Sequence, residues 1–151
     1  MNTDPIYVLD THALVWFLKR NKLLGRRALN IMLDCRSQLV VPIFVFEEIA
    51  QKSIRFDYRS DRIGIPPGTA IRVVLGSSNI KVFPKSPAVA LEIMRLERAV
   101  NSKKEILPKQ DIPICATALA ITKALRGHSQ VLLISSDSGI RKWGRIPMIW
   151  D

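Results

Sequence analysis

Residues 6–17 read IYVLDTHALVWF, and the fold can be predicted outward from this stretch. Its first four residues form a short apolar run with β-forming residues that stops at Asp10, which predicts a buried strand. From Thr11 the chain stays apolar to Lys19, which predicts a helix that starts directly after the acid. A buried strand followed at once by a helix is the first half of a β-α-β unit.

The same alternation continues along the whole chain. Gln38 begins a second apolar run ended by Pro42, and Ser86 with Pro87 carries the signature of a helix N-cap followed by proline in the first turn. Strands are predicted at residues 38–41, 80–83, 131–134 and 147–149, and helices at residues 25–34, 43–54, 70–75, 87–99 and 111–125, with a surface loop or short helix at residues 55–67. We therefore predict one domain over residues 1–151, an α/β/α sandwich around a mainly parallel sheet of about four to five strands.

Composition favours a single globular domain with an anionic partner. The chain has 151 residues, 48% of them hydrophobic, and a formal net charge of +10. A charge of this sign and size favours nucleic acid as the partner, although solubility alone or an acidic protein partner would also account for it. No apolar run approaches the ~20 residues of a membrane span, and the N-terminus lacks the pattern of a secretion signal. We expect a cytoplasmic protein without membrane contact.

Several kinds of chemistry find no support in the sequence. Cys35 and Cys115 are the only cysteines and lack the spacing of a zinc site, and the apolar neighbours of Cys115 predict a buried side chain. The only histidines are His12 and His128, which lie in distant parts of the chain and do not indicate a paired-histidine ribonuclease. Nucleotide-binding loops and the serine motif of α/β-hydrolases are also missing.

The positions of a few carboxylates are more informative. Asp10 follows the first strand, Asp137 follows the strand at 131–134, and Asp111 begins an otherwise apolar helix. Glu47 and Glu48 interrupt the apolar helix after the second strand. Because ligands bind outside the carboxyl ends of strands in open α/β sheets, these side chains could converge in one acidic pocket. Clustered carboxylates repel one another unless a cation neutralises them, and Mg²⁺ prefers oxygen ligands.

Each acid also has a purely structural interpretation. Asp10, Asp111 and Asp137 are all placed to cap a following helix, and either glutamate could face solvent. The two glutamates lie at similar angles from the apolar stripe of their helix, so periodicity does not decide between them. Taken one at a time, the cap and the functional interpretations remain open.

Four segments resemble the PIN-domain family in the right order along the chain. They are YVLDTHALVWF at residues 7–17, VPIFVFEEIAQK at 41–52, DIPICATAL at 111–119 and LISSD at 133–137, with a final PMIW at 147–150. The first segment is most similar to PIN domains of the VapC type, the toxins of bacterial and archaeal toxin–antitoxin pairs. In place of the histidine-rich or Asp-Pro-Phe-like stretch that usually precedes the family's third acid, this chain has Leu-Pro-Lys-Gln at residues 107–110.

The resemblance implies a PIN-like fold and an endoribonuclease that depends on Mg²⁺ or Mn²⁺. Matched motif by motif, it implies a metal-binding catalytic cluster and supporting hydroxyl groups. The cluster comprises Asp10, Glu48, Asp111 and Asp137, with Glu48 preferred over Glu47 by motif register, and the supporting hydroxyls are those of Thr11 and of Ser135 or Ser136. It also suggests a homodimer and a small antitoxin protein made in trans that inserts a segment against the acidic pocket. A PIN nuclease that processes RNA without an antitoxin and a non-catalytic nucleic-acid-binding module remain alternatives.

Basic residues provide candidate contacts to RNA. Arg141 and Lys142 are the leading ones because they closely follow Asp137. Further candidates are Arg55, Arg59, Arg62, Lys103, Lys104, Lys109 and Arg145. Contacts of this kind give affinity for phosphates but little sequence preference. Trp16, Phe17 and Leu24 could form part of a protein-binding surface, with core packing as the simpler interpretation.

Overall fold

The computed structural model describes residues 4–55 and 67–151, so the predicted surface loop lies almost entirely outside the described residues. The strands are β1 (Ile6–Leu9), β2 (Gln38–Pro42), β3 (Ile80–Phe83), β4 (Val131–Ile134) and β5 (Met148–Ile149). The helices are α1 (Thr11–Leu18), α2 (Arg26–Leu33), α3 (Ile43–Arg55), α4 (Pro67–Leu75), α5 (Pro87–Asn101), α6 (Ile112–Leu125) and α7 (Ser138–Trp143), and a 3₁₀ turn, η1 (Lys109–Asp111), precedes α6. Each predicted strand and helix is present, with ends shifted by a few residues at most.

All five strands join one sheet in the order β3-β2-β1-β4-β5, and every neighbouring pair is parallel. This confirms the predicted sheet. The chain first moves outward from β1 through β2 to β3, and then returns to β4 on the other side of β1. The carboxyl ends of β1 and β4 therefore flank the point where the strand order reverses, which is where open α/β sheets bind ligands.

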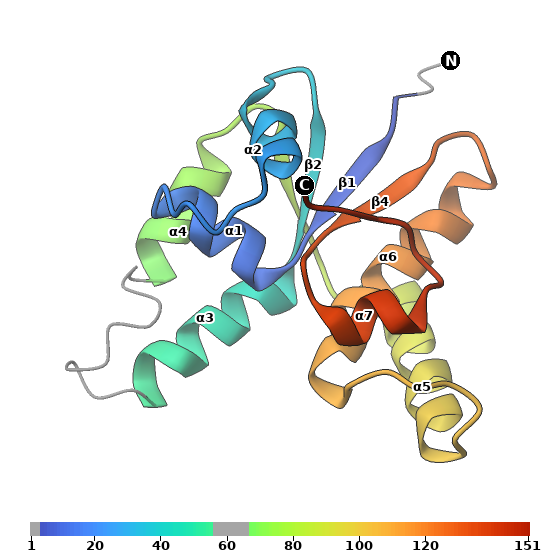
Figure 1. The fold of residues 1–151 in the computed structure, drawn as a ribbon. Coiled ribbons are helices and arrows are strands. Elements are labelled where there is room, and N and C mark those ends of the chain that lie inside the picture. Colours follow the sequence, from blue (N-terminus) through green and yellow to red (C-terminus); the bar gives the residue numbers. More distant parts are fainter. Residues whose placement is uncertain (1–3, 56–66) are drawn as a thin grey trace.

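Helices cover both faces of the sheet (Figure 1). In Figure 1, α1, α2 and α4 lie on one side, and α5 and α6 pack together on the other. Residues 114–121 of α6 are buried without interruption, because this helix is enclosed by the sheet and its neighbours. Even so, no helix in the described ranges has the length and apolarity to cross a bilayer.

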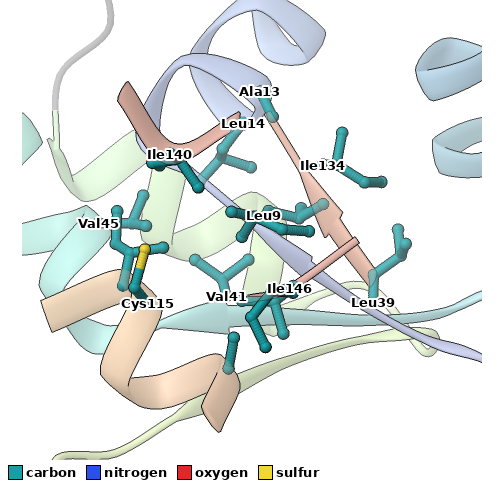
Figure 2. Packing of buried hydrophobic residues seen from close by; sticks show 14 of the residues in the cluster. Leu9, Ala13, Leu14, Leu39, Val41, Val45, Cys115, Ile134, Ile140 and Ile146 are labelled. Carbon is teal, nitrogen blue, oxygen red and sulfur yellow. The ribbon is translucent and has the colours of Figure 1, made fainter. Parts of the chain in front are cut away.

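The core is centred on β1 and β4. Figure 2 shows Leu9 of β1 in one cluster with Val45 of α3, Cys115 of α6 and Ile140 of α7. Cys115 is fully buried, as its apolar neighbours predicted. Three helices that carry predicted site residues are thus fixed to the end of the same strand by ordinary hydrophobic packing.

One buried charge escaped the sequence analysis. Glu92 of α5 is 4% exposed and pairs with Lys123 of α6 at 2.5 Å and with Arg95 at 2.9 Å. Its position in the sequence gave no sign of burial, because α5 carries charges on much of its surface. The two ion pairs compensate the burial of this carboxylate where α5 and α6 meet.

The C-terminal strand is held against α2 through a glycine. The carbonyl oxygen of Trp150 accepts a hydrogen bond from the Ala28 amide at 3.0 Å, and Trp150 also packs edge-on against Trp16. A Cβ atom on Gly25 would lie 1.9 Å from the same carbonyl oxygen. Only glycine leaves room for this close approach of two backbone segments.

We predict that Gly25→Ala lowers the free energy of unfolding by at least about 2 kcal/mol, because the added methyl group meets a fixed carbonyl. Urea denaturation followed by circular dichroism measures the change. Gly68→Ala is the matched control, since its Cβ would meet only the flexible end of Arg72 at 3.8 Å. Equal stability of the two variants would show that the tail does not depend on this contact.

Candidate active site at the carboxyl ends of β1 and β4

The predicted acids gather where β1 and β4 end. Asp10 follows β1 directly, and its backbone amide donates to the carbonyl of Ile134, the last residue of β4, at 3.2 Å. Asp137 lies just after β4, and Asp111 ends η1 at the start of α6. The structure therefore brings residues from three distant parts of the chain to one edge of the sheet.

Asp10 is the most buried of these acids, with 6% of its surface exposed. Its Oδ1 accepts a hydrogen bond from the Ala13 amide at 2.7 Å and so caps α1. Burial raises the pKa of Asp10, while hydrogen bonds from the Ser135 hydroxyl and the Ala13 amide oppose that rise. The cap interpretation is confirmed, and the carboxylate also accepts the hydrogen bond from Ser135.

Asp137 is built in the same way. Its Oδ1 accepts from the Ile140 amide at 2.9 Å and caps α7. Its own amide donates to Ser135 Oγ at 3.1 Å, and that serine is fully buried. Ser135 therefore contacts both Asp10 and Asp137 and fixes them relative to each other, whereas Ser136 is exposed.

The two glutamates of α3 have different surroundings. Glu48 is half-buried, accepts a short hydrogen bond from the Thr11 hydroxyl and pairs with Lys52 at 2.6 Å. Glu47 is exposed and belongs to none of the ion pairs found among the described residues. The structure thus places Glu48 with the cluster and Glu47 beside it, a distinction that helical periodicity alone did not provide.

Asp111 has the least compensated carboxylate. Its side chain makes no cap hydrogen bond to α6, so the cap interpretation is wrong for this residue. Its Oδ2 is buried without a hydrogen-bond partner among the described residues. Burial, together with the charges of Asp137, Asp10 and Glu48, raises the pKa of Asp111 to about 7. At neutral pH the site therefore needs a proton or a cation.

The thiol of Cys115 lies one helical turn after Asp111 and is affected by the same negative charges. Burial and the charges of Asp111, Asp137 and Asp10 raise its pKa. The thiol therefore stays neutral and packs as a small hydrophobic side chain. It is neither a nucleophile nor a metal ligand in this arrangement.

With this geometry established, comparison with known proteins identifies the family. The family model of the PIN domain matches residues 7–145. The chain belongs to the PIN-domain family. No curated protein matched the sequence.

Solved structures show the same fold. A chain of the VapBC2 structure from Rickettsia felis, bound to a DNA fragment from their promoter, superposes with a TM-score of 0.66 at 15% identity, over 97% of this chain and 99% of that one. A chain of VapBC-1 from nontypeable Haemophilus influenzae gives a TM-score of 0.62 at 16% identity, over 95% and 96%. A chain of DNA-bound VapBC from Salmonella typhimurium gives 0.59 at 12% identity, over 95% and 96%.

The acidic site of this PIN domain offers the ligands that hard divalent cations prefer. Asp10, Asp111, Asp137 and Glu48 supply only carboxylate oxygens, and the unpartnered Oδ2 of Asp111 is a ready acceptor for a cation. In the part of the chain described, no three histidine, cysteine or acidic side chains are grouped closely enough to hold a metal ion by themselves. An open set of carboxylates is compatible with Mg²⁺, which usually keeps several waters.

The basic candidates have mixed surroundings. Arg141 and Lys142 are exposed on α7, close in sequence to Asp137. Lys103 and Lys104 are exposed in the loop before η1, and Lys109 is exposed at the start of η1. Arg145 is engaged with Glu105 at 2.7 Å and stacks over Trp143. The side chains of Arg55, Arg59 and Arg62 lie outside the described residues. Arg141 and Lys142 thus stay available for contacts with a substrate.

Lys52 is a residue of the site that the sequence did not predict as a partner of the acids. The resemblance included a lysine at this position, and its spacing of four residues from Glu48 is that of a helical ion pair. That spacing could have indicated which glutamate is engaged, because Glu47 has no basic residue four positions later.

We predict that Asp111→Asn makes the protein more stable at pH 8 in the presence of a chelator. The folded chain holds a proton on Asp111 up to a pKa of about 7, whereas the ordinary pKa of an aspartate, as in the unfolded chain, is 3.8, so stability falls as pH rises between these values. The variant lacks this loss, and we expect a gain of about 1–2 kcal/mol at pH 8, because partial exposure screens the charge. Denaturation at pH 5 and pH 8 measures it.

Asp151→Asn, a change at an exposed carboxylate, is the control for this experiment. It should leave the pH dependence of the wild type unaltered. If Asp111→Asn lost stability between pH 5 and pH 8 as steeply as the wild type, the raised pKa of Asp111 would not be the cause of that loss.

Proposed function

We propose that this chain is a divalent-metal-dependent endoribonuclease that hydrolyses RNA phosphodiester bonds. The observation that carries the proposal is the buried, unpartnered Oδ2 of Asp111 beside three further carboxylates. A group of this kind is costly in an apoprotein and serves no cap or ion pair. The net charge of +10 on the chain supports a polyanionic substrate.

Asp10, Glu48, Asp111 and Asp137 would hold the Mg²⁺ or Mn²⁺. When bound, such an ion supplies Lewis-acid activation of water and of the phosphate. Carboxylates positioned at the ends of rigid strands and at helix starts hold their geometry better than carboxylates on loops.

The neighbouring polar residues position these acids. Ser135 donates to Asp10 and accepts from the Asp137 amide, so it sets the spacing of two acids from adjacent strands. Thr11 donates to Glu48, and Lys52 compensates its charge. Exposed Arg141 and Lys142 on α7 would contact the phosphates of the substrate, in line with the net charge.

We predict that Asp10→Asn reduces Mn²⁺-dependent cleavage of a single-stranded RNA at least about 100-fold while the fold survives. Asparagine retains an oxygen that can cap α1 through the Ala13 amide, so the loss would concern charge and not folding. Gel assays with and without chelator measure cleavage, and circular dichroism confirms folding.

Asp34→Asn, which alters an exposed carboxylate bonded to Arg36, serves as the control and should cleave like the wild type. If Asp10→Asn cleaved equally well, Asp10 would be a helix cap only, and the non-catalytic binding module would be the better function.

We further propose that a small antitoxin protein inhibits this enzyme in trans, in the cytoplasm. The structures of similar fold come from VapBC complexes, and an apolar groove of about 1070 Å³ lies between α1, α2 and the C-terminus. Leu23 and Leu33 in this groove are 63% and 64% exposed, and Arg20, Lys22 and Arg26 line it as well. The pattern suits an amphipathic segment with acidic flanks. The groove also contains Trp16, Phe17 and Leu24. Formation of a homodimer remains a separate prediction.

We predict that Leu33→Asp abolishes copurification with the product of an adjacent small gene and relieves inhibition of RNA cleavage. The control is Ile106→Asp, since Ile106 lies in the loop before η1, is 83% exposed and has the size of Leu33. This variant should change neither copurification nor inhibition. Both substitutions affect exposed positions, so thermal stability should be preserved. If no neighbouring gene product bound the wild type, a PIN nuclease that works without an antitoxin would be favoured.

A further inference from the structure

A separate pocket of about 320 Å³ adjoins the acidic site. It lies between α3 and the start of α6, and it shares Glu48 with the cluster. The residues around it are Phe44, Glu47, Glu48, Gln51, Lys52, Gln110, Pro113 and Ile114. Gln110 immediately precedes Asp111, so a molecule in this pocket would lie next to any substrate held by the acids.

The lining has the chemistry of a base-binding site and not of a phosphate site. Lys52 is the only cation among the lining residues, and it is already paired with Glu48 at 2.6 Å. The polar groups left are the amides of Gln51 and Gln110 and the exposed carboxylate of Glu47, beside the ring of Phe44. Single-stranded RNA bases are recognised by stacking on aromatic rings and by hydrogen bonds along their edges.

We propose that this pocket binds one nucleobase of a single-stranded RNA beside the cleaved bond and gives the enzyme its base preference. This inference rests on the proposed ribonuclease function. Phe44 provides the stacking surface, and the amides of Gln51 and Gln110 provide both donors and acceptors. The volume is at the small end of ligand pockets, which suits one base better than a protein segment.

Glu47 determines which base fits. A carboxylate offers only acceptors, and its two oxygens match two adjacent N–H donors. Guanine presents such a pair, the imino N–H and the amino group, on its Watson–Crick edge. Uracil offers a single N–H between two carbonyl oxygens, which the carboxylate repels. The pocket therefore favours guanine.

The experiment compares cleavage patterns of the full chain on a pool of random single-stranded RNA with Mn²⁺, read by sequencing the product ends. The wild type should show guanine enriched at one position next to the cleaved bond. Glu47→Gln should reduce that enrichment about tenfold and raise adenine, which glutamine pairs with well. Gln51→Ala should flatten the preference, and Phe44→Leu should raise KM more than it lowers kcat.

Gln130→Ala is the matched control, because Gln130 is exposed just before β4, at the opposite edge of the sheet. Its cleavage pattern should equal that of the wild type. Glu47 and Gln51 are exposed, so their variants test the pocket even where Phe44→Leu fails to fold.

Binding separates failure of this inference from failure of the proposed function. Fluorescence anisotropy compares guanine-rich and uracil-rich oligonucleotides on Asp10→Asn, with and without Glu47→Gln. A guanine preference that Glu47→Gln removes supports the pocket even if the wild type cleaves no RNA, which would overturn only the nuclease. If all variants cleaved RNA with the same base preference as the wild type, the proposal that this pocket selects the base would be overturned. Unchanged RNA patterns with lost antitoxin inhibition would assign the pocket to the protein partner and also overturn the inference.

Discussion

The rest of the site depends on the parallel pairing of β1 with β4. The pairing runs from Ile6 beside Val131 to Leu9 beside Ile134, and it continues into the hydrogen bond from the Asp10 amide to the Ile134 carbonyl. Because the two strands lie more than 100 residues apart in the sequence, only the crossover through α5 and α6 can bring Asp10 and Asp137 together. The same crossover places Asp111, at the start of α6, against the cluster.

The convergence of these acids has an electrostatic cost for the folded state. Burial and the like charges at one sheet edge raise the pKa of Asp111 to about 7, and its Oδ2 has no hydrogen-bond partner among the described residues. Among those residues, the cation that reaches the cluster is Lys52, which pairs with Glu48. The fold tolerates this because the apolar core beneath, with Leu9, Val45 and Ile140, does not involve the acids. Stability is thus supplied by packing, while the site keeps an electrostatic strain that a cation would relieve.

The sequence predicted the architecture well because its signals are local. The sequence alone indicates the apolar runs of β1 and β4 and the helix cap at Ser86, and this cap is present in the structure. Helical periodicity did not separate Glu48 from Glu47. The spacing to Lys52 favours Glu48, but the hydrogen bond that joins Glu48 to the cluster comes from Thr11, which lies 37 residues away in the chain. The pairing of buried Glu92 with Lys123, which lies 31 residues away, was missed for the same reason.

The helix caps show how structural and chemical roles combine in this PIN domain. Asp10 and Asp137 each use Oδ1 to cap the helix that follows, and a cap contributes on the order of 1 kcal/mol. Capping restricts the rotamer of each carboxylate, and the Ser135 hydroxyl, which contacts both residues, adds to this restriction. Asp111 lacks such a bond, and the 3₁₀ turn before α6 positions it instead. The interpretation of these acids as caps and their interpretation as ligands are therefore complementary, because a capped carboxylate is an oriented one.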